Sequence, residues 1–305
     1  MSVASKQRLW KQVTGTVVLQ RDYARGFRWL ELEVPGDFHM PLAGQFVQLL
    51  LTPPSPVLLP RPMSIAGAVR KRARAGKPGP IVLGFLYAPV GVGTRAIAAL
   101  EPGSAVEVTG PLGVGYPLAA PGTPVLVAGG RGVAPLLMAA DALAAQGRRC
   151  EFVFGAREKE LLIGLAEARE RIARAGGRLH LATDDGSRGF TGDVVQLLDT
   201  LRVKWKGAPH VIHACGPHGM LGAIARWGMR HEVPAHLAME SVMACGTGVC
   251  RGCPLPRSSS AREAVLALGA ETSSLLALKG NPEFAMCCTD GPVFEAHDLD
   301  WDRVE

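Results

Sequence analysis

The sequence predicts a β-barrel, then an α/β domain with a parallel sheet, then a small cysteine-rich domain. Three observations support this order: short β-rich runs come first, strands alternate with helices in the middle, and five of the seven cysteines crowd the end. Because domains usually contain about 100 to 200 residues, a chain of 305 residues has room for two large domains and a small one. We expect these domains at residues 1–118, 119–238 and 239–305.

The barrel is predicted from short runs that Gly and Pro separate. Residues 27–34 alternate between apolar and polar side chains with a period close to two, which is typical of a half-buried strand. Several strands at such spacing predict an antiparallel barrel. We expect strands at residues 13–19, 27–34, 46–51, 81–87 and 105–109, with one short helix at 94–100.

From Pro124 onward the pattern changes to strands that alternate with helices. This alternation predicts a parallel sheet with crossover helices. The stretch 117–124, rich in Pro, Ala and Gly, is the natural boundary between the two domains. We expect strands at residues 125–128, 151–154, 179–182 and 211–214, and helices at 135–145 and 158–173.

The formal charge of +6 is scattered over most of the chain, so we interpret it as a solvated surface without nucleic-acid binding. No apolar stretch approaches the roughly 20 residues that span a bilayer, and residues 1–10 lack the apolar segment of a secretory signal. We therefore expect a cytoplasmic protein. The densest basic cluster contains no aromatic residue and fits a loop between two strands, or alternatively a contact for an acidic partner: Arg70, Lys71, Arg72, Arg74 and Lys77.

The clustered cysteines predict a metal site, because thiols in a reducing compartment rarely form disulfides. Cys245, Cys250 and Cys253 have the C-x4-C-x2-C spacing of plant-type 2Fe-2S ligation. A structural zinc site is the alternative, but it usually has C-x2-C spacing in both halves. From spacing alone, Cys287 and Cys288 compete as the fourth ligand.

Several loops between a strand and a helix are compatible with phosphates or nucleotides. Gly130 and Gly132 follow one strand and open a helix, which would place backbone N–H groups where a pyrophosphate could bind. A tight connection without a ligand is the alternative. Similar positions are occupied by Thr183-Asp-Asp-Gly-Ser187 and Cys215-Gly-Pro217, and in the first domain by Arg61-Pro-Met-Ser64 and Gly91-Val-Gly-Thr94.

Taken in order, these motifs resemble the ferredoxin-reductase-like flavoproteins, and most closely the electron-transfer subunits of bacterial type B, NAD-dependent dihydroorotate dehydrogenases. The resemblance covers nearly the whole chain and includes Leu86-Tyr87, Gly110-Pro-Leu-Gly113, Met220-Leu221 and a closing Cys-x-Asp-Gly-Pro-Val-Phe element at 288–294 that is peculiar to this group. In that element Cys288 stands two residues before Asp290, so the resemblance makes Cys288 the fourth ligand and Cys287 a spare thiol.

The resemblance implies three cofactors and a partner. FAD would lie on the barrel at Arg61, Pro62, Met63, Ser64, Leu86, Tyr87, Ala88, Gly93 and Thr94. NAD(H) would bind at Gly130, Gly132, Thr183, Asp184, Cys215 and Gly216, and a 2Fe-2S cluster at Cys245, Cys250, Cys253 and Cys288. Electrons would pass from the FMN of a catalytic partner subunit through the cluster and FAD to NAD+, in de novo pyrimidine (UMP) biosynthesis, within a heterotetramer. No residue of this chain is expected to act as a catalytic acid or base.

Three departures from the family pattern stand out: Ala88 where relatives often have Arg, Arg131 at a usually apolar position, and 34 residues between Cys253 and Cys288. Residues 263–278 of this insertion have a helical pattern. Arg251 would either raise the potential of a cluster or simply solubilise the surface. Two other functions use similar motifs: a subunit of an NAD(P)H-dependent ferredoxin reductase or sulfide dehydrogenase, and an iron-sulfur redox sensor without turnover.

Overall fold

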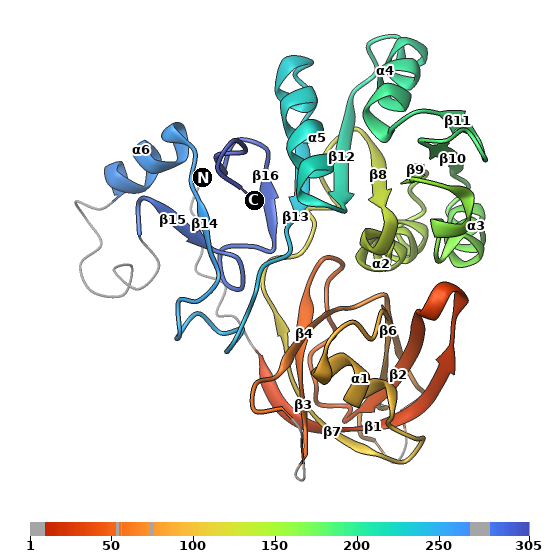
Figure 1. Ribbon diagram of the computed structural model, residues 1–305, viewed down its shortest axis with the longest axis vertical. Helices are drawn as coiled ribbons and strands as arrows, with labels where there is room; N and C mark the ends of the chain where they lie inside the picture. The colour runs from red at the N-terminus through yellow and green to blue at the C-terminus, as the bar shows by residue number, and fades with distance from the viewer. Residues whose placement is uncertain (1–9, 53–54, 56, 74–75, 269–280, 305) are drawn as a thin grey trace.

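The computed structural model describes residues 10–52, 55, 57–73, 76–268 and 281–304, and two seven-stranded sheets dominate it (Figure 1). The first sheet is antiparallel and curled, in the order β4-β3-β7-β1-β2-β6-β5. Its strands are β1 (Lys11–Asp22), β2 (Arg28–Val34), β3 (Phe46–Leu51), β4 (Arg61–Ser64), β5 (Gly67–Arg70), β6 (Ile81–Tyr87) and β7 (Ala105–Leu112), and helix α1 (Val92–Ala98) follows β6.

One short stretch of chain joins the two edges of this curled sheet. Strand β4 pairs with β3 at one edge, and β5 pairs with β6 at the other. Between them the N–H of Ile65 donates to the carbonyl of Gln45, whereas the N–H of Ala66 donates to that of Gly84. The predicted barrel is therefore a curled half-barrel, whose edge strands β4 and β5 are linked by this stretch.

The second sheet is parallel except at one edge, in the order β11-β10-β9-β8-β12-β13-β16. Strand β16, near the C-terminus, pairs antiparallel with β13. The strands are β8 (Thr123–Gly129), β9 (Glu151–Ala156), β10 (Arg178–Thr183), β11 (Phe190–Thr191), β12 (His210–Cys215), β13 (Ala235–Ala238) and β16 (Val293–Glu295). The helices are α2 (Val133–Ala145), α3 (Leu165–Arg174), α4 (Val194–Trp205) and α5 (His218–Arg230), with short 3-10 helices at Ala24–Gly26, Gly130–Gly132 and Lys159–Leu161.

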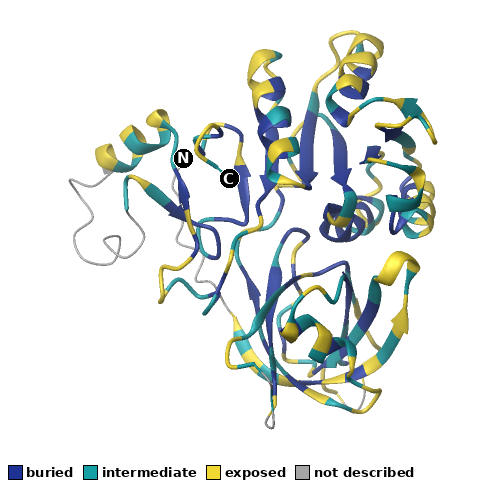
Figure 2. Ribbon diagram, viewed as in Figure 1, coloured by how far each residue is buried: buried dark blue, intermediate teal, exposed yellow. Residues whose placement is uncertain are grey.

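Helices cover both faces of the parallel sheet, so its central strands are buried (Figure 2). In β8, Leu126 and Ala128 belong to the core beneath α2 and α3, whereas Val125 and Val127 belong to the core beneath α4 and α5. This alternation follows from the two-residue period of a strand, and burial on both faces explains why β8 reads as a continuous apolar run.

The last part of the chain adds a hairpin and a helix beside the second sheet. Strand β14 (Pro254–Pro256) pairs with β15 (Phe284–Met286), and α6 (Ser259–Leu268) follows β14. The helical pattern expected at 263–278 is helical as far as Leu268, and its remainder lies outside the described residues. None of the helices in the described ranges is long and apolar enough to cross a bilayer.

The predicted fold class is confirmed, and β3 and β6 have the expected bounds. The single helix expected at 158–173 is wrong, because the structure divides it into a 3-10 turn and α3. The chain leaves the helical path at Leu162, and Gly164, with a left-handed φ of 86°, comes directly before the first residue of α3. The basic cluster leads from β5 to β6 as expected, although Arg74 lies outside the described residues.

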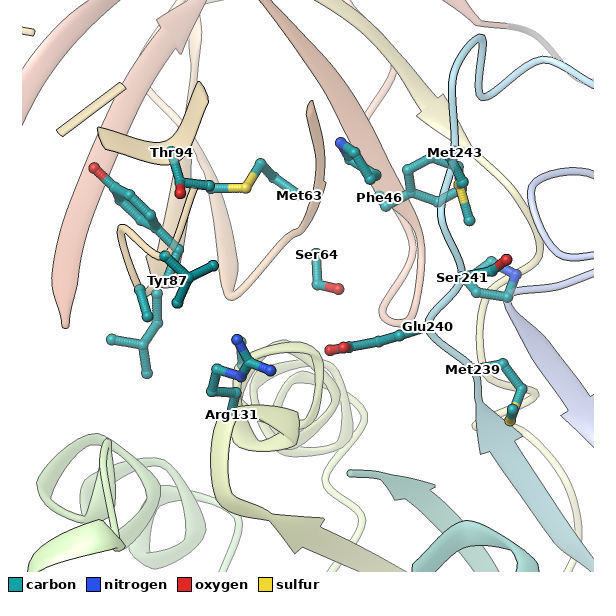
Figure 3. A pocket seen from close by; sticks show the side chains of 16 residues that line it. Phe46, Met63, Ser64, Tyr87, Thr94, Arg131, Met239, Glu240, Ser241 and Met243 are labelled. Atoms are coloured by element: carbon teal, nitrogen blue, oxygen red, sulfur yellow. The ribbon is translucent and has the colours of Figure 1, made fainter. Parts of the chain in front are cut away.

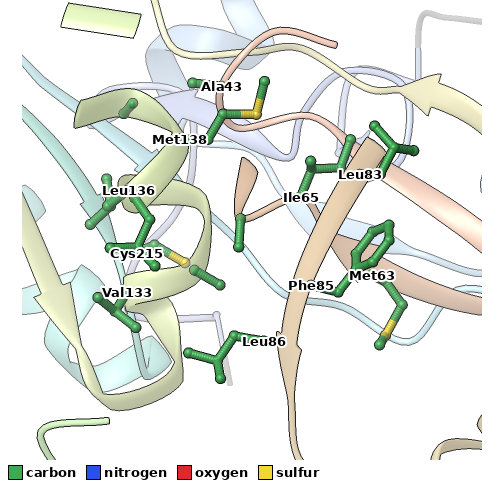
Figure 4. Close-up of a cluster of buried hydrophobic side chains, with 14 of the residues drawn as sticks. Ala43, Met63, Ile65, Leu83, Phe85, Leu86, Val133, Leu136, Met138 and Cys215 are labelled. Carbon is green, nitrogen blue, oxygen red and sulfur yellow. The ribbon is translucent and has the colours of Figure 1, made fainter. Parts of the chain in front are cut away.

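The barrel and the parallel sheet share one core. Leu83, Phe85 and Leu86 from the barrel belong to the same buried cluster as Val133 and Leu136 from α2 (Figure 4). At its margin, Arg171 of α3 donates through Nη1 to the carbonyl of Ala66, at 2.6 Å. The same guanidinium pairs with Asp141 at 3.0 Å and is largely buried, with 13% of its side chain exposed.

We predict that Arg171→Met destabilises the protein far more than Arg174→Met, although both arginines pair with Asp141. Loss of Arg171 leaves the carbonyl of Ala66 and part of Asp141 without a partner in a buried place, which should lower the free energy of unfolding by about 1–3 kcal/mol. Arg174 is 56% exposed, so its loss should cost less than about 1 kcal/mol. Urea denaturation measures both, and equal losses would contradict this account.

Candidate functional site

A groove lies where the barrel, the start of α2 and the segment after β13 meet (Figure 3). The barrel forms most of one wall, and the start of α2 and the segment after β13 form the rest of the groove. The lining residues are Phe46, Pro62, Met63, Ser64, Leu86, Tyr87, Ala88, Val90, Thr94, Arg131, Ala134, Met239, Glu240, Ser241, Met243 and Pro292. Seven of the nine residues expected at a flavin are among them, and Arg61 and Gly93 lie next to it.

Arg61 and Gly93 are in contact at the start of α1. A Cβ atom added to Gly93 would lie 2.3 Å from Nε of Arg61, so the guanidinium packs against the glycine backbone and would have to move aside for a larger residue. Thr94 closes the same turn, because its Oγ1 accepts the N–H of Gly91 at 3.0 Å. The Arg61 guanidinium, whose Nη1 donates to the carbonyls of Leu59 and Pro60, thus lies at the start of α1 beside one end of the groove, where a cation suits phosphate binding.

Tyr87 and Ser64 line the groove from two strands; the Ser64 hydroxyl lies in the groove, whereas that of Tyr87 points away from it toward Gln20 (Figure 3). The Tyr87 hydroxyl accepts from Nε2 of Gln20 at 3.1 Å, and burial raises its pKa, so this phenol stays neutral at physiological pH. Ser64 is exposed and pairs in register with Phe46 of β3. Ser64 can therefore hydrogen-bond a ring edge without introducing a charge, and the Tyr87 ring can pack beside it.

Two charged side chains enter the groove from opposite sides. Arg131, from the turn after β8, and Glu240, from the segment after β13, point toward the space beside Ser64 (Figure 3). Sequence reasoning noted Arg131 only as a departure from the family pattern, and it missed Glu240, Phe46, Met239, Ser241 and Met243. The available signal was that Glu240 follows the end of a buried strand, at the edge where α/β sheets bind ligands.

The glycine turn after β8 packs directly against the end of β12. A Cβ at Gly132 would lie 2.1 Å from the carbonyl oxygen of Cys215 and 2.6 Å from the N atom of Gly216. Gly130 has a left-handed φ of 51° and open space around it. The turn therefore brings the ends of β8 and β12 together and keeps its outer side accessible, which suits close approach of a pyrophosphate.

The side chain of Thr183 forms hydrogen bonds within its own loop. Thr183 is fully buried, and its Oγ1 donates to the carbonyl of Arg188 at 3.0 Å and accepts the N–H of Arg188 at 2.9 Å. Asp184 is exposed at the same sheet edge. Of these two predicted nucleotide contacts, Asp184 has the side chain that is free to reach a ribose.

Cys215 ends β12 inside the core that the barrel shares with α2 (Figure 4). Only 3% of it is exposed, and burial raises the pKa of its thiol well above the ordinary value. Burial therefore favours the neutral thiol over the thiolate. It lies between the two sheets, opposite Leu86.

Backbone N–H groups surround the sulfur atoms of the cysteine loop. Sγ of Cys245 accepts the N–H groups of Thr247 and Cys250, both at 3.4 Å. Sγ of Cys250 accepts the N–H of Gly252 at 3.4 Å, and Sγ of Cys253 accepts that of Cys288 at 3.5 Å. Gly246 and Gly248 have left-handed φ angles of 71° and 87°, which allow the tight turns that this arrangement needs.

The four predicted ligands stand as two pairs. The sulfur atoms of Cys253 and Cys288 lie 3.2 Å apart, and Sγ of Cys245 accepts the backbone N–H of Cys250. Within the described ranges, no three His, Cys, Asp or Glu side chains already converge on a point that would hold a metal ion. The thiols are nevertheless suited to ligation, because an iron-sulfur site uses thiolates that accept N–H hydrogen bonds.

Electrostatics favour thiolates at two of these positions. Partial burial opposes ionisation of Cys245, but the N–H groups of Cys250 and Thr247 lower the pKa of its thiol to about 6. The hydrogen bond with Cys288 lowers the pKa of Cys253 to about 7 and raises that of Cys288. Cys287, by contrast, points toward the carbonyl of Met239 at 3.6 Å, and burial raises its pKa.

We predict that Gly132→Ala is strongly destabilising, whereas Gly219→Ala is not. The new methyl group at 132 would collide with backbone atoms of β12, which cannot move aside as a side chain can. At Gly219, in α5, a Cβ meets nothing within 4 Å, and alanine favours a helix by up to about 1 kcal/mol. Thermal unfolding of both variants tests this. An unchanged midpoint for Gly132→Ala would show that Gly132 is not packed tightly against β12.

Comparison with known proteins gives a consistent result. Residues 126–226 match the family model described as oxidoreductase NAD-binding domain. The electron transfer subunit of dihydroorotate dehydrogenase B (NAD(+)) from Bacillus caldolyticus is 33% identical over 292 residues, which cover 93% of this chain and 96% of that protein. The subunit of the same name from Geobacillus thermodenitrificans is 34% identical with the same coverage.

Solved structures agree at the level of the fold. A structure of an NADH-dependent reduced ferredoxin-NADP oxidoreductase superposes with a TM-score of 0.72 at 24% identity, covering 95% of this chain and 91% of the other. The ferredoxin reductase of a carbazole 1,9a-dioxygenase gives 0.60 at 18% identity, covering 76% and 70%. Together with the near full-length match to its curated relatives, these similarities show that the chain belongs to the family of electron transfer subunits of dihydroorotate dehydrogenase B (NAD(+)).

Proposed function

We propose that this chain carries electrons between a dihydroorotate dehydrogenase catalytic subunit and NAD(H), using bound FAD and a 2Fe-2S cluster. The observation that supports this most directly is the course of the chain after β13. Residues Met239, Glu240, Ser241 and Met243 line the groove, and Cys245 follows two residues later. One continuous segment therefore forms a wall of the proposed flavin site and begins the proposed cluster site.

The barrel side of the groove would hold FAD. Arg61 and the start of α1 would bind its phosphates, and Ser64 and Tyr87 would contact the ring system. Flavin, when bound, supplies the ability to exchange both hydride pairs and single electrons, which a nicotinamide and an iron-sulfur centre each require. Arg131 and Glu240 would set the charge around the ring from the opposite wall.

The carboxyl edge of the parallel sheet would hold NAD(H). The turn at Gly130 and Gly132 would approach the pyrophosphate, and Asp184 would accept ribose hydroxyl groups. Cys215 and Gly216 would lie behind the nicotinamide, since they end β12 at the contact with the barrel. This placement would bring NAD(H) to the side of the groove that Arg131 and Ala134 line.

The cysteine loop would hold the cluster through Cys245, Cys250, Cys253 and Cys288. Cys250 is exposed, so the loop reaches the protein surface. The partner would be an FMN-containing catalytic subunit, assembled with this chain in a heterotetramer. An exposed ligand loop suits single-electron exchange with such a partner, because the surface ligand shortens the path between the two proteins.

The proposal predicts a protein with one flavin, two irons and two sulfides per chain, which oxidises NADH with an artificial acceptor. Co-purification with a candidate catalytic subunit should then couple dihydroorotate oxidation to NAD+ reduction. Metal and flavin analysis, an optical spectrum and both activity assays measure this. A flavin-free protein would refute the assignment, and an intact NADH oxidase that couples to ferredoxin alone would identify a ferredoxin reductase instead.

A matched pair of adjacent cysteines tests the cluster ligands. Cys288→Ser should abolish the 2Fe-2S spectrum, because it removes the thiol in contact with Cys253, while flavin content and NADH oxidation by ferricyanide persist. Cys287→Ser should keep the cluster, since its thiol faces the carbonyl of Met239. Iron analysis and electron paramagnetic resonance of the reduced proteins distinguish them, and the opposite pattern would exchange the roles of the two cysteines.

A further inference from the structure

Gln48 is a buried carboxamide with no hydrogen-bond partner among the described residues. Only 1% of this residue is exposed, and both Oε1 and Nε2 are unsatisfied. Leaving a buried polar group unpaired costs about 1–3 kcal/mol. A position of this kind needs a partner in the working protein, or it would be better filled by an apolar side chain.

The Gln48 side chain lies against the cysteine loop. A Cβ atom added to Gly246 would lie 2.7 Å from both Cγ and Nε2 of Gln48. Gly246 directly follows Cys245 and is itself buried. The donor end of the carboxamide therefore touches the backbone of the loop between two proposed cluster ligands.

The direction of Gln48 follows from the period of strand β3. Val47 and Leu49 point into the barrel core, whereas Phe46 belongs to the core that includes Cys253 and Cys288. Phe46 also lines the groove. Gln48 lies on the same face of β3 as Phe46, two residues further along, so one strand face contacts both the groove and the cysteine loop.

We propose that Gln48 is a positioning residue of the iron-sulfur site, whose Nε2–H group donates a hydrogen bond to a sulfur atom of the cluster. This inference rests on the proposed function, and it adds a residue from the barrel to a site otherwise built from the C-terminal segment. A donor to sulfur stabilises the more negative, reduced cluster and so raises its reduction potential. Gln48 would thereby tune electron exchange between the cluster and the groove.

The test compares Gln48→Leu and Gln48→Met with the wild type in the full-length, cluster-loaded protein. Redox titration followed by electron paramagnetic resonance should show about a tenfold shift of the one-electron equilibrium toward the oxidised cluster, equivalent to about 59 mV. Iron and sulfide content should stay at the wild-type level. The methionine variant keeps the length of the side chain and serves if the leucine variant fails to fold.

Gln45→Leu is the matched control. Gln45 lies three residues away, but its amide already has partners in this chain: Nε2 donates to the carbonyl of Gly113 at 2.8 Å, and Oε1 accepts the N–H of Leu42 at 2.9 Å. Its loss should leave the potential unchanged. A potential that shifts equally in the Gln45 and Gln48 variants would overturn the inference, because the effect would then come from general loosening.

A second measurement uses protein from which the cluster has been removed by a chelator. There Gln48→Leu should raise the thermal midpoint, since it eliminates two unsatisfied polar atoms. Two results would overturn the role of Gln48 but leave the proposed function standing. One is a lowered thermal midpoint of the cluster-free variant, and the other is a cluster-loaded variant with an intact cluster and an unchanged reduction potential. A wild-type protein without any 2Fe-2S signal overturns the proposed function and this inference with it.

Discussion

The groove depends on one physical constraint, which is that the barrel and the α2 face of the parallel sheet bury a common apolar surface. Leu86, Val133 and Cys215 belong to this surface, and all three lie at the ends of elements that carry polar site residues. Burial of this kind is non-directional, so hydrogen bonds at its margin fix the angle between the two sheets. The bond from Arg171 to the carbonyl of Ala66 does this next to the stretch that joins β4 to β5.

Within that frame, close backbone contacts place the site more finely than side-chain packing does. Gly132 lets the turn after β8 touch the end of β12, and Gly93 lets Arg61 approach the start of α1. At Gly132 a methyl group would collide with backbone atoms of β12 and push the two segments apart, whereas at Gly93 it would displace the end of the Arg61 side chain. The electrostatic character of the groove then comes from the two charged side chains that enter it, Arg131 and Glu240, with Arg61 beside it.

The sequence predicted the architecture well because period and composition carry that information. The alternation in 27–34 and the strand-helix order after Pro124 both correspond to observed elements. The sequence could not predict that β16 joins the second sheet, because strand pairing across more than 50 residues leaves no local pattern. Glu240 and Gln48 were not predicted as site residues for a related reason. The role of each depends on neighbours in space that are distant in the sequence. The helix expected at 158–173 is interrupted before α3, where Gly164 adopts a left-handed φ.

Because β14 pairs with β15, the length of the insertion between them does not alter the geometry of the cysteine loop. Pro256 stands opposite Phe284, so the chain leaves and returns at neighbouring points, and the thiols of Cys253 and Cys288 remain 3.2 Å apart despite the residues between them. Lengthening a loop whose ends are already held together costs little, because closure entropy grows only with the logarithm of length. This part of the chain is thus a natural attachment point: a reporter domain or affinity tag inserted between β14 and β15 would leave the spacing of Cys253 and Cys288 intact.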